Sequence, residues 1–226
     1  MLHQTQVARV AGVYDGFLAQ FPTPSAMAAA GPGAVIVAWG RLGYPRRARR
    51  LWEAAVVIDA RGWPADLTDL PGVGRYTAAA VRAQSDGVDA PALDVNVRRV
   101  VERVRGERLT DAQGERAMVV IGKPLRGRDR LLALMDVGAL LCRPREPRCG
   151  ECPLRRRCAA RAPLPHERRA RQAPFAGSFR ERRGRVMARV REGAVPVEHL
   201  DADALASLVA DGLAVLEHGS ARLPDL

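Results

Sequence analysis

The residues best suited to chemistry in this sequence are four cysteines that lie close together near position 150. Their spacing is C-x6-C-x2-C-x5-C over 17 residues, at Cys142, Cys149, Cys152 and Cys158. Four thiolates gathered in so short a segment can hold a 4Fe–4S cluster. Structural zinc sites usually contain two close cysteine pairs, and here only the second and third cysteines form one, so zinc is the second choice. Arginines flank this cysteine array and would present positive charge to phosphate groups.

A second segment is suited to binding phosphate through its backbone. It consists of Leu70, Pro71, Gly72, Val73 and Gly74. A helical segment begins directly after it, near Tyr76. The glycines let the chain turn tightly, and the free amides of the turn and of the helix start can point at a phosphate. Such contacts hold a DNA strand without reading its sequence. Taken alone, the segment has an ordinary tight turn as its alternative explanation.

One carboxylate stands in a mainly apolar stretch. Asp94 lies between Leu93 and Val95, and a helix is predicted to begin near Asn96. A partly buried carboxylate needs a polar partner or a function. The structural explanation is that Asp94 caps the helix, because aspartate is a favoured N-cap residue. A catalytic role needs support from the rest of the chain.

The elements that must carry these residues are helices. The chain has 226 residues, of which 47% are apolar and 27% are charged, which is typical of one or two folded domains. Apolar residues recur with a helical period through the first 60 residues and again over 96–104 and 131–141, and proline and glycine separate these segments. No convincing alternating pattern occurs before residue 190. The first 160 residues are therefore predicted to be all-α.

The last part of the chain differs in character. Residues 143–171 form a loop-rich segment in which arginines outnumber glutamates. Beyond it the pattern predicts a basic helix over 180–191, an amphipathic helix over 203–211 and a hairpin about Gly219 and Ser220, an order that resembles a winged helix. A module that merely packs on the larger domain is the alternative. The predicted domains are 1–91, a helical cluster domain over 92–165, and 166–226 with the basic linker and the small α+β module.

Charge and hydropathy limit the partners. The net charge of +11 favours a polyanion such as nucleic acid, although Lys123 is the single lysine among 36 basic residues and a GC-rich genome also produces arginine in place of lysine. The longest apolar stretches, such as 34–39, fall far short of the roughly 18 residues that a membrane span needs. The first residues form no export signal. We therefore expect no membrane partner, a cytoplasmic, nucleoid-associated location, and cysteines that bind metal rather than form disulfides.

The hairpin segment, the aspartate and the cysteine array occur in the order and spacing of the helix-hairpin-helix DNA glycosylases, and the chain resembles this superfamily from residue 1 to about 160. Its MutY-like adenine glycosylase branch is the most similar. The segments that carry the resemblance are 1–7, 21–24, 39–44, 46–49, 70–77, 94–98, 135–139 and the cysteine array. The resemblance implies a helical bundle with a helix-hairpin-helix motif, a 4Fe–4S cluster, double-stranded DNA as the partner, and a monomer.

The resemblance also implies a reaction. Adenine mispaired with guanine or 8-oxoguanine is flipped out of the duplex, and its glycosidic bond is hydrolysed. Asp94 would stabilise the oxocarbenium-like sugar, as carboxylates do in glycoside hydrolysis, and Asn96 would orient that site. Gln4 and Tyr44 match residues that wedge into the duplex beside the mispair. The residues matched to other DNA contacts are Leu70, Gly72, Val73, Gly74 and Tyr76.

Position 76 separates branches of the superfamily. Endonuclease III-like members place a lysine there, which forms a Schiff base with the sugar and cleaves the strand. Tyr76 carries no amine for that step. The expected activity is therefore a monofunctional glycosylase. A thymine or pyrimidine mismatch glycosylase of the same superfamily is the alternative enzyme, because Asp94 and the hairpin would serve it equally.

The chain departs from the family pattern in four places. It begins at the methionine of the first motif, and no residue of the sequence maps onto the glutamate that protonates the departing adenine. We expect a start codon assigned too late, the alternative being a weakly active paralogue that binds mismatched DNA. Without that acid, hydrolysis would be slower by ~10²- to 10⁴-fold. His3 replaces a glutamine, Leu132 replaces a polar residue, and some fifty residues after Pro174 cannot form a Nudix-like domain. Activity on both A:G and A:8-oxoguanine is expected, with less discrimination between them than an enzyme with a Nudix-like domain would show.

Overall fold

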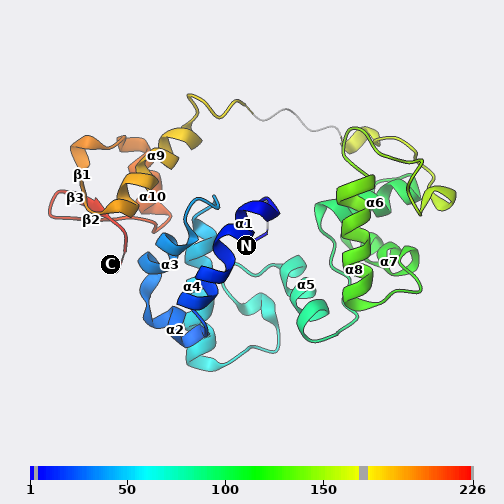
Figure 1. The fold of residues 1–226 in the computed structure, drawn as a ribbon, viewed down its shortest axis with the longest axis horizontal. Helices are drawn as coiled ribbons and strands as arrows, with labels where there is room; N and C mark the ends of the chain where they lie inside the picture. Colours follow the sequence, from blue (N-terminus) through cyan, green and yellow to red (C-terminus); the bar gives the residue numbers. More distant parts are fainter. Residues whose placement is uncertain (3–4, 168–172, 225–226) are drawn as a thin grey trace. The chain divides into compact units, whose positions relative to one another are not determined.

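The computed structural model describes residues 1–2, 5–167 and 173–224. The chain forms two compact units, one made of residues 1–72 and 172–226 and the other of Val73–Arg171 (Figure 1). Up to residue 167 the described chain consists of helices and loops, and a small three-stranded sheet follows near the C-terminus. The prediction of an all-α body with a small α+β module is confirmed. Within these described residues no helix combines the length and the apolar character that crossing a membrane requires.

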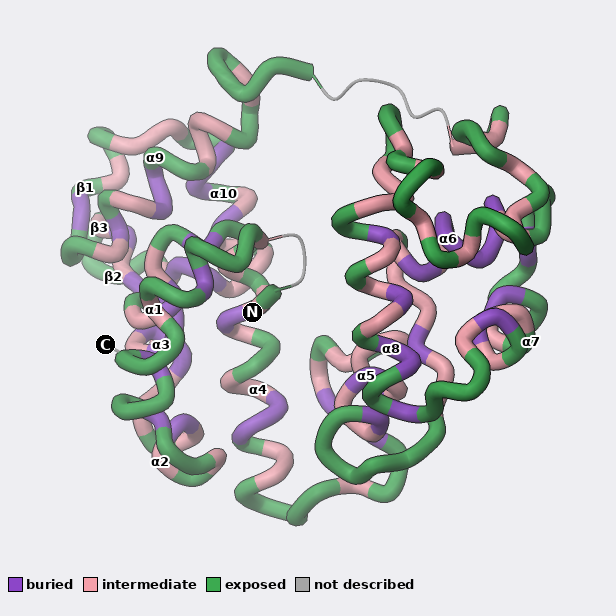
Figure 2. Tube along the Cα trace, turned by 45° about the vertical axis from the view of Figure 1, so that its right-hand side comes forward, coloured by how far each residue is buried: buried purple, intermediate pink, exposed green. Residues whose placement is uncertain are grey.

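The N-terminal part of the first unit is a bundle of four helices: α1 (Val7–Gln20), α2 (Pro24–Ala29), α3 (Gly31–Trp39) and α4 (Arg46–Arg61). Thr23 caps α2 by accepting a hydrogen bond from the Ala26 amide at 3.1 Å, and Pro24 occupies the first helical position. Helix α4 packs on α2 and α3, and buried residues recur along it while most of its arginines stay at the surface (Figure 2). This pattern is that of an amphipathic helix lying on a core.

The C-terminal module has the element order of a winged helix. It consists of α9 (Phe179–Glu192), β1 (Val195–Pro196), the 3₁₀ turn η5 (Val197–His199), α10 (Ala202–Ala210), β2 (Val215–Glu217) and β3 (Ser220–Arg222). The antiparallel sheet has the order β1-β3-β2, with Ala221 opposite both Val195 and Leu216. The predicted helices and hairpin are present. Strand β1 was not predicted, because two residues are too few for a periodic signal.

The second unit is built around α6 (Val95–Arg105). Helix α6 packs against α7 (Asp111–Ile121), α8 (Gly127–Asp136) and the π-helical turn η2 (Val137–Leu141), while α5 (Arg75–Ser85) packs on α8. Val97, Val100 and Leu131 are fully buried in this core. The left-handed Gly106 ends α6. The 3₁₀ turn η3 (Arg155–Arg157) lies between the third and fourth cysteines, η4 (Pro165–Glu167) follows the fourth, and η1 (Leu67–Asp69) precedes the hairpin.

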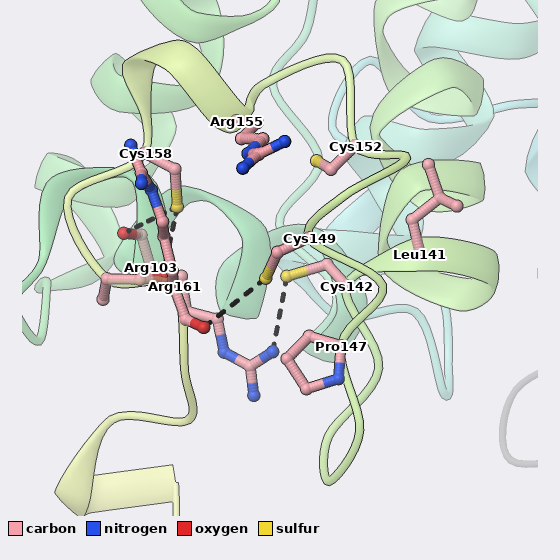
Figure 3. A pocket seen from close by; sticks show the side chains of 10 residues that line it. Arg103, Leu141, Cys142, Pro147, Cys149, Cys152, Arg155, Cys158 and Arg161 are labelled. Carbon is pink, nitrogen blue, oxygen red and sulfur yellow. Dashed lines mark hydrogen bonds between the residues drawn. The ribbon is translucent and has the colours of Figure 1, made fainter.

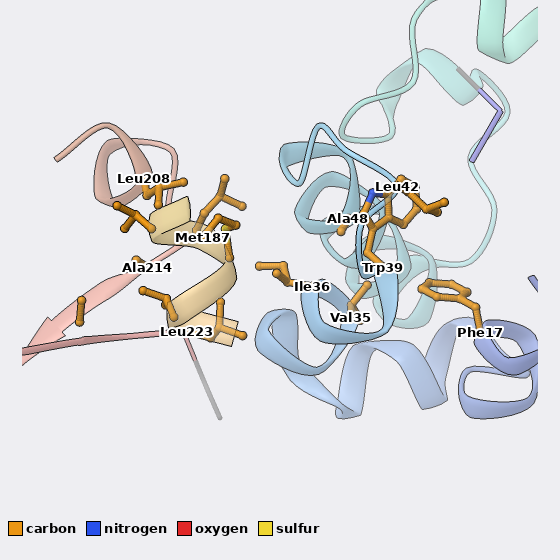
Figure 4. Packing of buried hydrophobic residues seen from close by; sticks show 14 of the residues in the cluster. Phe17, Val35, Ile36, Trp39, Leu42, Ala48, Met187, Leu208, Ala214 and Leu223 are labelled. Carbon is orange, nitrogen blue, oxygen red and sulfur yellow. The ribbon is translucent and has the colours of Figure 1, made fainter. Parts of the chain in front are cut away.

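The two units divide the chain at points other than the predicted boundaries. Helix α5 was predicted to belong with residues 1–91, but its Ala80 and Ala83 lie in the core of the second unit. The C-terminal module was predicted as a separate domain, but Met187 and Leu208 share one apolar core with the N-terminal helices, and Ile36 of α3 points toward Met187 (Figure 4). Periodicity shows that a helix has an apolar face without showing which partner covers that face.

Candidate functional site

Asp94 lies at the N-terminus of α6 and caps it, as predicted. Its Oδ1 accepts a hydrogen bond from the Val97 amide at 2.6 Å, and its Oδ2 accepts one from Nδ2 of Asn96 at 3.0 Å. The residue is half-buried. Each carboxylate oxygen is therefore held by one donor and keeps further lone pairs for another partner. The cap is compatible with a catalytic role, because a fixed carboxylate needs no reorganisation when positive charge develops nearby.

The orientation of the Asn96 amide follows from its second neighbour, Arg99. The guanidinium Nη2 of Arg99 donates to Oδ1 of Asn96 at 2.9 Å. Because a guanidinium can only donate, the amide oxygen must face Arg99 and the amide nitrogen must face Asp94. The predicted partnership of Asp94 and Asn96 is present in the geometry, and Arg99 holds it.

Arg99 was not among the predicted site residues, although it connects Asp94 to the cysteine array. The side chain is 7% exposed, its Nε donates to the Cys142 carbonyl at 2.7 Å, and its Nη2 also donates to the Gly138 carbonyl at 2.7 Å. Burial lowers the pKa of Arg99, although the charge of Cys142 acts in the opposite direction. The sequence contained one signal for Arg99: it follows Asn96 by three residues, and residues three apart share one face of a helix.

Gly138 was also missed as a site residue. A Cβ atom at this position would lie 2.8 Å from Cβ of Asn96 and 2.9 Å from its carbonyl oxygen. The close approach of η2 to the first turn of α6 therefore requires glycine. Gly138 belongs to the segment 135–139, so the motif was recognised while its packing function was not.

The four cysteine side chains line one hollow next to Arg103 (Figure 3). They come from the end of η2 and the two loops that follow, and none of them forms a disulfide. Burial raises the pKa of the Cys142 thiol, while the charge of Arg103 and its hydrogen bond, with Nη1 3.5 Å from Sγ, lower it. Within the described part of the chain, no three His, Cys, Asp or Glu side chains converge as ligands of a single metal ion would. Four thiols around one hollow are a donor set with the chemistry of a thiolate-bound metal group.

Arg103 fastens the segment after the cysteines to α6. The residue is 1% exposed, and it binds Glu167 through two hydrogen bonds, Nε to Oε1 at 2.8 Å and Nη2 to Oε2 at 2.5 Å. Burial of Glu167 would raise the pKa of its carboxyl, but the hydrogen bonds from Arg103 and the Leu164 amide outweigh it and lower the pKa. A two-pronged pair of this kind fixes direction as well as distance. It holds the segment after the cysteines against α6.

The hairpin segment connects η1 to α5. Leu70 is buried and anchors it, Val73 is half-buried, and the exposed Gly72 has a φ of 78° that only glycine adopts without strain. Gly74 is the N-cap of α5, and among the described residues no side-chain hydrogen bond caps this helix. A helix start that follows glycines is a common position for binding an anion.

Comparison with known families identifies this arrangement. Residues 1–121 match the family described as HhH-GPD superfamily base excision DNA repair protein. The chain belongs to the HhH-GPD superfamily. The match includes the hairpin and the hydrogen-bonded residues Asp94, Asn96 and Arg99, whereas Gly138 and the four cysteines lie beyond it.

Relatives of this HhH-GPD protein include adenine DNA glycosylases, a thymine-DNA glycosylase and endonuclease III. The chain is 40% identical over 238 residues to the adenine DNA glycosylase of Mycolicibacterium smegmatis, covering 94% of this chain and 80% of that protein. It is 36% identical over 191 residues to human adenine DNA glycosylase, covering 79% of this chain and 35% of that protein. A thermostable thymine-DNA glycosylase superposes with a TM-score of 0.63 at 30% identity, covering 70% of this chain and 78% of that one. A non-covalent endonuclease III–DNA complex gives 0.61 at 25% identity, covering 69% and 77%.

The remaining predicted residues of the HhH-GPD chain have different surroundings. Tyr44 is 57% exposed and has a φ of 49°, an uncommon backbone conformation for a residue with a side chain, and the guanidinium of Arg47 lies 5.4 Å from its ring centroid. Burial, and to a smaller extent the charge of Asp94, raise the pKa of Tyr76, so its hydroxyl stays protonated at neutral pH. Gln4 lies outside the described residues. Leu132 is partly exposed on α8.

Proposed function

We propose that this protein is an adenine DNA glycosylase that removes adenine mispaired with guanine or 8-oxoguanine from double-stranded DNA, and that it acts as a monomer. The observation that carries the proposal is the carboxylate of Asp94, fixed by the Val97 amide and Asn96 at the start of α6. The adenine specificity is supported by the 40% identity to the M. smegmatis adenine DNA glycosylase over 94% of the chain.

The chemistry follows from the charge that develops on the sugar. Breaking the glycosidic bond of a flipped adenosine leaves positive charge on the deoxyribose, and the negative charge of Asp94 stabilises it. The donors on both carboxylate oxygens hold Asp94 in one orientation through the reaction. Tyr76 has no amine to trap the sugar, so water completes a hydrolysis. The chain's positive charge and the amides of the α5 N-terminus bind the phosphates.

We also propose that Cys142, Cys149, Cys152 and Cys158 hold a 4Fe–4S cluster. Support comes from the shared hollow and from Arg103 beside it, which offsets the negative charge of the thiolates. When bound, a cluster would cross-link the loops that carry these cysteines. It would thereby order the arginines at the hollow, including Arg155 and Arg161, which could contact DNA phosphates.

The test is single-turnover release of free base from duplexes that contain A:G, A:8-oxoguanine, T:G or an oxidised pyrimidine, using iron-loaded protein. Adenine release from both adenine mispairs is expected. Asp94→Asn keeps a capping side chain but removes the charge, so the rate should fall by ~10²- to 10³-fold. Asp201→Asn is the matched control, because Asp201 caps α10 in the same way, accepting from the Ala204 amide at 2.9 Å.

Three outcomes would contradict the proposal. Release of thymine from T:G instead of adenine would assign the alternative specificity, which the likeness to the thymine-DNA glycosylase favours. Tight binding of mispaired duplex with no base release would indicate a binding protein. If Asp94→Asn releases base as fast as Asp201→Asn, Asp94 only caps the helix and has no catalytic role.

A further inference from the structure

The C-terminal module has the element order of a DNA-binding winged helix, but it has no excess of positive charge. In helix-turn-helix folds the second helix of the motif enters the major groove, and α10 is the helix at this place. Helix α10 contains no basic residue, and Asp201 and Asp203 stand at its start. Residues 173–224 contain as many carboxylates as arginines, so the whole positive excess of the chain lies in residues 1–172. The electrostatic attraction that dominates binding to DNA must therefore come from elsewhere in the chain.

Two of the arginines of α9 form ion pairs within the module itself. Arg182 pairs with Asp201 at 2.9 Å, and Arg183 pairs with Asp211. These ion pairs join α9 to both ends of α10. They use two of the side chains that would otherwise be candidates for phosphate contacts.

The C-terminal end of α10 holds α4 of the N-terminal bundle. Nη1 of Arg49 donates to the Asp211 carbonyl at 2.5 Å, and Nε of Arg46 lies 3.4 Å from the Asp211 carboxylate. Carbonyls at the end of a helix attract cations. Gly212 has a φ of 61°, and a Cβ atom there would lie 1.4 Å from Nη1 of Arg49. Only glycine therefore allows this arginine to reach the helix end.

The same turn of α4 supports the phosphate-binding hairpin. A Cβ atom on Gly72 would lie 2.7 Å from Cβ of Arg50, so the hairpin rests directly on this side chain. Glu53 connects the two neighbouring arginines, with Nε of Arg49 at 3.0 Å and Nη1 of Arg50 at 2.9 Å. The contacts run from Gly212 through Arg49, Glu53 and Arg50 to the hairpin.

We propose that the C-terminal module positions the hairpin by holding Arg49, and that the module itself does not contact DNA. The inference rests on the proposed function, in which the hairpin amides bind a DNA phosphate. Arg49 is then a positioning residue: without its anchor the α4 turn and Arg50 shift under Gly72. A hydrogen bond weakens steeply as its donor turns away from the acceptor. Affinity for any duplex should fall, while the chemistry at Asp94 should not change.

The test compares two glycines of the module by duplex binding over a series of salt concentrations. Gly212→Ala and Gly219→Ala both place a side chain at a left-handed position, but only Gly212 touches Arg49, and Gly219 faces open space. Gly212→Ala should weaken binding by about three- to tenfold relative to Gly219→Ala, where tenfold corresponds to 1.4 kcal/mol. The dependence of affinity on salt should be unchanged, and so should single-turnover base release at saturating protein.

Variants of Arg49 test the same contact without changing Gly212, so they do not depend on whether Gly212→Ala folds. Arg49→Met should weaken binding about as much as Gly212→Ala, Arg49→Lys should recover part of the loss, and the double variant with Gly212→Ala should be no weaker than the worse single change. Urea unfolding identifies any variant that fails to fold. If Gly212→Ala does not fold, the comparison of Arg49→Met with Arg49→Lys decides whether Arg49 positions the hairpin.

Several results would overturn the inference. Equal binding by Gly212→Ala and Gly219→Ala would do so, as would additive losses in the double variant. Arg185→Gln on the exposed side of α9 should leave the salt dependence unchanged, and a slope reduced by about one would show that the module contacts phosphate directly. If the native protein binds no duplex at all, the proposed function fails, which is a separate result from failure of the Gly212 comparison.

Discussion

Replacing Arg99 by methionine would disconnect Asp94 from the cysteine array. The change removes the donors to the carbonyls of Cys142 and Gly138 and leaves both without their arginine partner. An unsatisfied buried carbonyl costs about 1–3 kcal/mol, and the apolar methionine offsets part of that cost, so a net loss of about 2–4 kcal/mol is expected. For a unit of about 100 residues, this corresponds to a lower melting temperature by roughly 10–25 °C.

The same change would also release Asn96, whose amide then turns freely against Asp94. A misplacement of about 1 Å at a reacting centre can cost ~10²-fold in rate. The assay is single-turnover adenine release at a temperature where the variant is folded, paired with thermal unfolding followed by circular dichroism. Arg98→Met is the matched control, because Arg98 is the neighbouring arginine of α6 but donates to the Leu109 carbonyl and Asp111.

The two arginine variants should differ clearly in their rates of adenine release. Arg98→Met should keep its rate within a few-fold of the native protein, whereas Arg99→Met should lose most of its activity even when fully folded. A folded Arg99→Met protein that releases adenine at the native rate would refute the idea that Arg99 holds the Asp94–Asn96 pair.

Further expectations concern other contacts. Gly138→Ala should lower stability by about 1–3 kcal/mol and slow adenine release, because the new methyl group would collide with Asn96; a native-like variant in both assays would contradict the packing. The Gly127 amide and, less strongly, Arg130 lower the pKa of Asp89, so this carboxylate stabilises the fold above its unfolded pKa of ~3.9 and loses that effect as pH falls through the lower folded value. The deficit of Asp89→Asn in urea unfolding should accordingly be present at pH 7 and vanish in acid. Because Tyr76 has no amine, borohydride should trap no covalent DNA complex that is independent of the Met1 amine, and efficient trapping would show a lyase.

Much of the site could be predicted from the sequence because its signals are local. Each signal can be recognised from residues that are close together in the sequence. These signals are the cysteine spacing, the glycines at 72 and 74, and the aspartate that precedes a helical pattern. The N-cap role of Asp94 was predicted for the same reason, since a cap binds an amide three residues on. The roles of Arg99 and Gly138 were not predicted, because their partners lie about forty residues away along the chain.

The amino-acid sequence by itself determined the helical character of this chain, the order of its motifs and the family to which it belongs, because periodicity, glycine turns and ligand spacing are properties of short segments. Only the tertiary structure decided which helices share a core, that α5 belongs with α8, and that Gly212 and Gly72 both contact one turn of α4. Apolar faces attract without direction, so close packing between distant segments selects the partners.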